Sequence, residues 1–176
     1  MKNFLLSLKE GVAQKDVPEP FLPHFKTLIQ LRALIFKNDL YVLDPSHLVG
    51  KMDVAFSGTG YLSSLEPTRS KDLIIEAKDL HGAMRGDLVV AKHIVNKRGG
   101  RAKAVVVYIA QRAFAKSIVY TKMSKGKVVG VNVKNESMFE ITASQKSLKQ
   151  LPLGSVLKID NITNVIEEVL GILGDP

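Results

Sequence analysis

The middle of the chain gathers most of the excess positive charge. Between Arg85 and Lys116 there are eight basic side chains and a single acid, Asp87. A basic stripe attracts polyanions, which are most often nucleic acid or an anionic membrane surface. The alternative is a solvated face that only keeps the chain in solution. The basic residues that we expect to contact phosphate, in this stripe and just before it, are Arg69, Lys71, Arg85, Lys92, Lys97, Arg98, Arg101 and Lys103.

The remaining reactive side chains are not spaced for catalysis or metal binding. His24, His47, His81 and His93 show none of the short spacings that bring two imidazoles to one metal ion. The acids lie mostly singly or beside basic residues, whereas two-metal phosphodiester chemistry needs several converging carboxylates. We therefore expect no catalytic residue, no metal site and no cofactor in this chain.

Length and composition limit the class of protein. The chain has 176 residues, of which 45% are apolar and 24% charged, and its formal net charge is +8. It can bury a core, and its length suits roughly one ordinary domain or two to three small ones. It has no cysteine, which suits the reducing cytoplasm, where we expect it. The N-terminal apolar run is too short for a signal peptide and no run approaches a membrane span, so we predict no membrane association.

The first fifty residues have the pattern of a helical segment that ends in a hairpin. Apolar residues recur at helical spacing from Phe4 to Leu8, and a second helix is predicted from about Pro23. Two apolar runs then flank Lys37-Asn38-Asp39, which is the chemistry of a tight strand turn. We therefore predict a winged-helix-like segment over residues 1–50, either as a nucleic-acid contact or as a packing element only.

From Lys51 onward, short apolar strands alternate with turns rich in glycine and charge. Met52, Val54 and Phe56 alternate with polar residues, as on a half-buried strand. The strands that we predict in this part cover 52–56, 61–65, 73–75, 88–94 and 104–109. Such a series of short strands favours the OB-fold, a small Greek-key barrel that binds single-stranded nucleic acid.

The rest of the chain repeats this unit. An offset of 68 residues superposes Gly58 on Gly126 and Gly86 on Gly154. The basic loop from Asn96 to Lys103 has only a shorter, nearly uncharged counterpart in the second copy. We therefore predict a mainly β fold with a helical N-terminal segment and two tandem small OB-fold barrels, over residues 51–116 and 117–176.

Motifs in both copies match a known family. Those of the first copy are Phe56-Ser57-Gly58-Thr59-Gly60-Tyr61-Leu62, Asp72-Leu73-Ile74-Ile75-Glu76, Leu80-His81-Gly82-Ala83-Met84-Arg85-Gly86-Asp87-Leu88-Val89 and the stretch 101–111. They resemble the first cold-shock domain of ribonuclease R-like exoribonucleases in the ribonuclease II family, and the third motif is the most specific. The ending Glu168 to Pro176 is similar to the close of that family's second cold-shock domain.

The resemblance implies that the chain is the N-terminal, RNA-binding part of a longer enzyme. Members of the family hydrolyse RNA from the 3′ end with aspartates that hold Mg²⁺ in a large domain after the cold-shock pair. That domain would lie beyond Pro176. We therefore expect this chain to bind RNA without cutting it, and its parent to be a Mg²⁺-dependent hydrolytic 3′→5′ exoribonuclease.

The match departs from the family pattern where base stacking is usually strongest. Cold-shock domains stack bases on aromatic side chains of two adjacent strands. Only Tyr61 remains here, because Thr59 replaces the first-strand aromatic and Ile74, Glu76 and Ala77 replace the second-strand set. We expect binding to depend mainly on phosphate contacts. Tyr61 is then either a single stacking residue or an ordinary half-buried strand tyrosine.

Three hypotheses about function stay open at this point. The leading one is a sequence-tolerant RNA-binding region that guides single-stranded RNA to a catalytic domain outside this chain. The second is a protein-interaction module that docks the parent enzyme on a partner such as an RNA helicase. The third is an independent RNA chaperone, which would require the natural gene to end at Pro176. An RNA titration without a partner separates the first hypothesis from the second.

Overall fold

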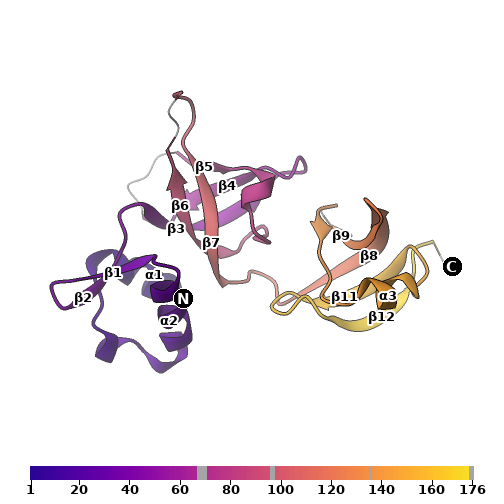
Figure 1. Cartoon of the computed structure of the whole chain (residues 1–176), viewed down its shortest axis with the longest axis horizontal. Helices are drawn as coiled ribbons and strands as arrows, with labels where there is room; N and C mark the ends of the chain where they lie inside the picture. Colours follow the sequence, from indigo (N-terminus) through magenta and orange to yellow (C-terminus); the bar gives the residue numbers. More distant parts are fainter. Residues whose placement is uncertain (67–70, 96–97, 135, 175–176) are drawn as a thin grey trace. The chain divides into compact units, whose positions relative to one another are not determined.

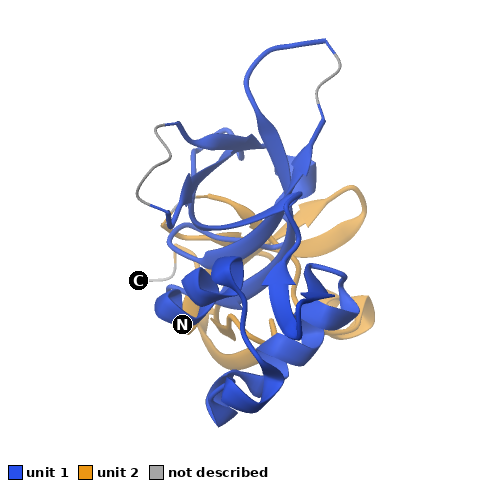
Figure 2. Ribbon diagram, turned by 90° about the vertical axis from the view of Figure 1, so that its left-hand side faces the viewer, with its two compact units in different colours: residues 1–113 blue, residues 114–176 orange. Residues whose placement is uncertain are grey.

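The computed structural model describes residues 1–66, 71–95, 98–134 and 136–174. The chain divides into two compact units, Met1–Ala113 and Phe114–Pro176 (Figure 2). Both are built mainly of β-strands, and helices precede the strands of the first, which confirms the predicted fold class. The domain boundaries that we expect at residues 50 and 116 stay predictions. Across the described ranges, no helix is long and apolar enough to cross a membrane.

Unit 1 begins with two helices and a hairpin (Figure 1). The hairpin turn has the predicted chemistry. Asn38 and Asp39 adopt φ values of 52° and 62°, the left-handed conformation of a two-residue type I′ turn, and Lys37 pairs with Leu40 across it. The elements of this part are α1 (Lys2–Glu10), η1 (Gln14–Asp16), η2 (Glu19–Phe21), α2 (Leu22–Gln30), β1 (Leu34–Lys37) and β2 (Leu40–Leu43).

These elements share a hydrophobic core with the outside of the barrel that follows. Phe25 and Leu28 of α2 are fully buried, and the same cluster includes Val49, Val90 and Ala110 from three barrel strands. Burial of side chains of this size stabilises the folded state by about 1.5 to 3 kcal/mol each. The helical segment is therefore packed onto the barrel within unit 1 rather than set apart from it.

The five strands that follow close into a barrel in the order β3-β4-β5-β7-β6. Met52, Leu62, Ile75 and Val89 point into its interior, where each is at most 2% exposed. Because side chains alternate along a strand, the neighbours of these residues face outward. The elements are β3 (His47–Val54), β4 (Gly60–Ser64), β5 (Leu73–Ile75), η3 (Ala77–Asp79), β6 (Leu88–Ile94) and β7 (Lys103–Gln111).

One end of a predicted strand was wrong. The alternation of apolar residues suggests a strand that includes Phe56, but β3 ends at Val54. The amide of Ala55 instead donates to the carbonyl of Thr59 and that of Gly58 to the carbonyl of Ala55, which forms a tight turn. Phe56 lies in this turn and is 84% exposed.

Unit 2 repeats the strand order of the first barrel. Its sheet runs β10-β9-β8-β11-β12, which matches β5-β4-β3-β6-β7 strand for strand. Gly86 and Gly154, which the offset superposes, adopt φ of 87° and 86°. A pairing of β5 with β7 closes the first barrel, whereas no pairing joins β10 to β12 in the described part of unit 2. The elements are β8 (Lys116–Ser124), β9 (Lys127–Asn132), β10 (Met138–Phe139), α3 (Gln145–Lys149), β11 (Ser155–Asp160) and β12 (Ile166–Ile172).

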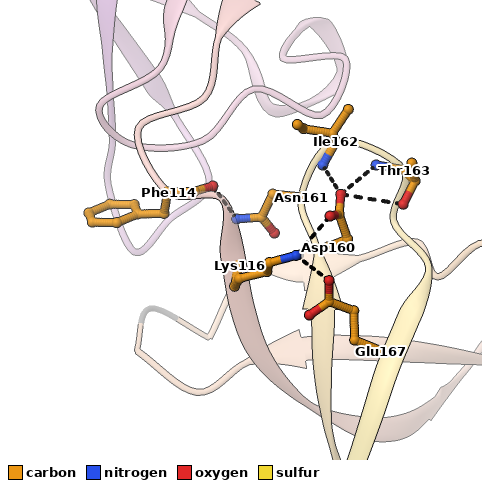
Figure 3. A network of polar contacts seen from close by, with 7 residues as sticks. All are labelled: Phe114, Lys116, Asp160, Asn161, Ile162, Thr163 and Glu167. Carbon is orange, nitrogen blue, oxygen red and sulfur yellow. Dashed lines mark hydrogen bonds and ion pairs between the residues drawn. The ribbon is translucent and has the colours of Figure 1, made fainter.

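The residues on either side of the junction are each bonded into their own unit. In unit 1, the buried carboxylate of Asp87 accepts hydrogen bonds from the backbone amide of Ala113 at 2.9 Å and from Nη1 of Arg112 at 2.9 Å. In unit 2, Nδ2 of the buried Asn161 donates to the carbonyl of Phe114 at 2.7 Å (Figure 3). Hydrogen bonds within unit 1 therefore extend to its last residue, Ala113, and hydrogen bonds within unit 2 begin at its first residue, Phe114.

Candidate nucleic-acid interface

The strand register places four side chains in one row on the outside of the first barrel. Asp53 of β3 pairs with Tyr61 of β4, Tyr61 with Ile74 of β5, and Ile74 with Lys103 of β7. Leu62, next to Tyr61, is buried inside the barrel, so Tyr61 faces outward. We call Asp53, Tyr61, Ile74 and Lys103 the outer row. It runs over the second and third strands of the barrel, the face that OB-folds use for oligonucleotides.

Tyr61 lies beneath a guanidinium group. Cζ of Arg101 lies 5.7 Å from the centroid of the Tyr61 ring, within the range of a cation–π interaction. Arg101 comes from the β6–β7 hairpin and is exposed, whereas Tyr61 is half-buried. The fold therefore brings together two of the residues predicted from the sequence, Tyr61 and Arg101, which lie far apart in the chain.

Lys103 is paired with an acidic residue, Glu76. Its Nζ lies 2.6 Å from Oε1 of Glu76, and Lys78 Nζ lies 3.4 Å from the other carboxylate oxygen. The hydrogen bond from Lys103 and then its charge are the largest causes that lower the pKa of Glu76, with Lys78 adding to them. Glu76 thus stays ionised and offsets part of the positive charge at this end of the outer row.

Arg85 occupies the opposite end of the outer row. Its Nε lies 3.2 Å from Oδ1 of Asp53, and both side chains are largely exposed. An exposed pair of this kind contributes little to stability, about 0 to 1 kcal/mol, and can be exchanged for another anion at small cost. Arg85 beside one end of the outer row and Lys103 at its other end are therefore cations that already have carboxylate partners.

A pocket of about 720 Å³ adjoins the hairpin that carries Arg101. Lys71 and Arg101 lie on its rim, and the buried Leu73 forms part of its apolar lining. Asp72 also lines the pocket, but its Oδ1 accepts a hydrogen bond from Oγ of Ser63 at 3.0 Å. The pocket combines cations on its rim with an apolar wall.

The other predicted basic residues are placed apart from this group. Lys92 lies on β6 opposite His47 and Val105, so the register does not set it beside Tyr61. Arg98 is exposed in the turn that leads to β7. Arg69 and Lys97 lie outside the described residues.

Sequence reasoning missed Phe56 as a feature of this surface. It was assigned to a strand, but it is an exposed ring in the β3–β4 turn, one of the loops that OB-folds use for ligands. The signal that could have revealed it is the Ser57-Gly58 pair that follows, since this pair favours a turn over a strand.

The corresponding surface of unit 2 has an aliphatic side chain in place of the ring, paired with Lys122 of β8. Val129 stands where the offset places the equivalent of Tyr61. Unit 2 also has a polar network at one end: Lys116 donates to Asp160 at 3.0 Å and to Glu167, and Asp160 also accepts from the amides of Ile162 and Thr163 (Figure 3). The hydrogen bond from Lys116, followed by these amides, lowers the pKa of Asp160 from its ordinary 3.8 to about 2. This network ties together the strands at one end of unit 2.

Comparison with known families agrees with this architecture. A model described as the first, N-terminal OB domain of ribonuclease R matches residues 3–104, and one described as the second OB domain of ribonuclease R matches residues 118–176. The chain belongs to the ribonuclease R family. Because the first model starts at residue 3, it includes the N-terminal helices that pack onto the barrel.

Curated relatives belong to the same family. Ribonuclease R of Helicobacter pylori is 30% identical in strain 26695 and 29% in strain J99, over 178 residues that cover 100% of this chain. The chain spans only 27% of the length of these relatives, so the catalytic domain of ribonuclease R is absent from it.

Two solved structures complete the comparison. Yeast Ssd1, a pseudonuclease, has a TM-score of 0.51 at 13% identity and covers 91% of this chain and 25% of its own, which supports the fold alone. Mycoplasma genitalium ribonuclease R in complex with ribose-methylated single-stranded RNA has a TM-score of 0.49 at 19% identity, covering 73% of this chain and 22% of its own.

Proposed function

We propose that this chain is the RNA-binding N-terminal region of a ribonuclease R-like exoribonuclease and that it guides single-stranded RNA to a catalytic domain outside this chain. The observation that carries the proposal is the outward-facing Tyr61, with Arg101 on its ring, in the row that also holds Lys103. A ring and exposed cations on the ligand face of an OB-fold provide both stacking and phosphate contacts.

The parent enzyme, in this proposal, is a Mg²⁺-dependent hydrolytic 3′→5′ exoribonuclease of the cytoplasm. Membership of the ribonuclease R family supports the exoribonuclease activity proposed for the parent enzyme. The absence of cysteine from the chain suits a reducing compartment such as the cytoplasm. This chain itself contributes binding and needs no cofactor. Purified alone, it should bind RNA without shortening it in the presence of Mg²⁺.

The proposed contacts centre on the pocket and on the turn beside it. Lys71 and Arg101 line the pocket and Arg98 is exposed in the turn before β7, so these three are the first candidates among the described residues. The full set proposed for RNA is Tyr61, Arg69, Lys71, Arg85, Lys92, Lys97, Arg98, Arg101 and Lys103.

A salt titration tests this proposal. The affinity for labelled oligouridine should fall with rising salt, with a slope of log K against log salt of about −2 if three phosphates are neutralised. Changing Arg98 and Arg101 to alanine should flatten the slope by about 1.4. Changing Lys122 and Lys146 of unit 2 gives the same loss of charge and should leave the slope nearly intact. A folded chain that does not bind RNA at low salt would exclude the proposal.

A second candidate function rests on the surface of unit 2. Along β12, Val169, Leu170 and Ile172 are 53%, 48% and 38% exposed, and Leu173 just beyond it is 57% exposed. A strand with this much exposed apolar surface suits a protein partner better than RNA. The candidate is a docking module for a partner such as an RNA helicase. Retained binding of a purified helicase by a chain that does not bind RNA would favour it over the first proposal.

A further inference from the structure

We propose that Arg101, supported by Tyr61, is itself the stacking surface for one base of the bound strand, and that the adjoining pocket holds that base. This inference rests on the proposed RNA-binding function and names the residue that contacts the base. In this proposal, the guanidinium plane of Arg101 takes the place of the aromatic side chains that the cold-shock pattern would have. The proposed site lies in unit 1 alone.

The position of Arg101 is the first observation. Tyr61 is half-buried in the strand, and Arg101 lies over its ring with Cζ 5.7 Å from the centroid. A base that approached this part of the ring would meet the guanidinium first. Because a guanidinium is planar and stacks on π systems, it can contact a ring on one side and a base on the other.

The contrast with the neighbouring cations is the second observation. Lys103 and Arg85 point to carboxylates, at 2.6 Å and 3.2 Å. Arg101 instead has a ring contact, and it is exposed in the hairpin. Its charge and its plane are therefore presented to solvent beside the outer row.

The pocket provides the third observation. Its volume of about 720 Å³ lies within the range of small-ligand sites and leaves room for one nucleotide. Leu73 and Ala102 give it apolar surface for a base, while Lys71 and Arg101 lie where a phosphate could be neutralised. A stacked base recognised by its face, with its phosphate held by charge, yields binding that tolerates any sequence.

The test separates the plane of Arg101 from its charge. Affinities are measured for a short oligouridine and for an abasic ribose phosphate oligomer of the same length, with the wild-type chain and with Arg101→Lys. Wild type should prefer the oligouridine by about tenfold, the usual gain from one stacked base. Arg101→Lys should bind the abasic oligomer as wild type does, yet lose most of the preference for bases.

Two further variants make the result decisive. Tyr61→Leu removes the ring beneath Arg101 and should cause the same loss of base preference, and Arg32→Lys, an exposed exchange in the turn before β1, should cause none. Thermal melting shows that each variant is folded. If Arg101→Lys keeps the full preference, the inference is wrong although RNA binding stands. If wild type binds neither oligomer at low salt, the proposed function itself fails.

Discussion

Nζ of Lys103 lies 2.6 Å from Oε1 of Glu76, across the pairing of β5 with β7 that closes the first barrel. A carboxylate on a surface proposed for RNA would by itself repel phosphate. Its pairing with Lys103 lowers that repulsion, but it also occupies a cation that could otherwise contact the strand. Glu76 therefore sets the charge that this end of the outer row offers to RNA.

Replacing Glu76 by glutamine should strengthen RNA binding. The change keeps a hydrogen-bond acceptor for Lys103 but removes the negative charge, so one more cation can neutralise phosphate. We expect an affinity gain of about threefold, the size of an exposed ion-pair effect, and a salt slope steeper by about 0.7. Fluorescence anisotropy over a range of salt measures both. Glu10→Gln, on α1, makes the same change in net charge and should alter neither value.

Replacing Asp87 by alanine should destabilise unit 1. Asp87 is 2% exposed and accepts hydrogen bonds from Arg112 and from the amides of Met84 and Ala113. Its removal leaves these donors without their acceptor, at a cost of about 3 kcal/mol in the free energy of unfolding. Urea denaturation measures the loss. Asp53→Ala removes an exposed pair with Arg85 and should cost about 0.5 kcal/mol or less. Equal losses of stability from the two changes would show that the buried hydrogen bonds of Asp87 do not stabilise unit 1.

The network at Asp160 should make unit 2 sensitive to strong acid. The pKa of Asp160 is about 2 in the folded chain against an ordinary 3.8, chiefly because Lys116 hydrogen-bonds it. Its stabilising effect is therefore complete above about pH 4 and is lost as the pH falls towards about 2. Amide NMR signals of Ile162 and Thr163 should shift in this window. Asp160→Asn should abolish that shift, and a wild-type midpoint near the ordinary value would disprove it.

His24 should make the stability of unit 1 depend on pH in a milder range. Nδ1 of His24 lies 2.5 Å from the hydroxyl of Tyr108, which links α2 to β7, and burial is the main cause that lowers its pKa from 6.5. The unfolded chain then takes up the proton more readily, so stability should fall as the pH drops below about 6.5. Urea midpoints at about pH 7.5 and about pH 5.5 measure this dependence.

His24→Gln should remove part of the dependence and not all of it. Burial also lowers the pKa of His47, which retains its own share of the acid sensitivity. An unchanged difference between the two urea midpoints would show that His24 is not the group that titrates.

Local chemistry was enough to predict much of the fold. The turn at Asn38 and Asp39, the alternation of apolar residues along the strands and the paired glycines Gly86 and Gly154 are all short-range signals, and each corresponds to an observed feature. Phe56 was misplaced because the apolar alternation continues to the second residue beyond the true strand end at Val54. The packing of Phe25 against barrel residues was not predictable, since it depends on contacts between distant segments.

The candidate site was predictable in its residues but not in its pairings. Tyr61 and Arg101 could each be selected by type from the sequence, but their contact depends on the register of β5 with β7. The same register brings Lys103 to Glu76, with which it forms an ion pair. Contacts of this kind depend on how strands that are far apart in the chain are aligned. The alternation of apolar and polar residues does not determine this alignment.

The bonding on both sides of the junction has a consequence for how the two units behave as a tandem. The amide of Ala113 is held by Asp87 and the carbonyl of Phe114 by Asn161, so a residue bonded into unit 1 is followed directly in the sequence by one bonded into unit 2. When two binding modules are joined by a short connection, a strand held by one has only a small volume to search before it meets the other. Inserting a flexible Gly-Ser segment between Ala113 and Phe114 would enlarge that volume and dilute one unit relative to the other, without altering a single side chain that contacts RNA.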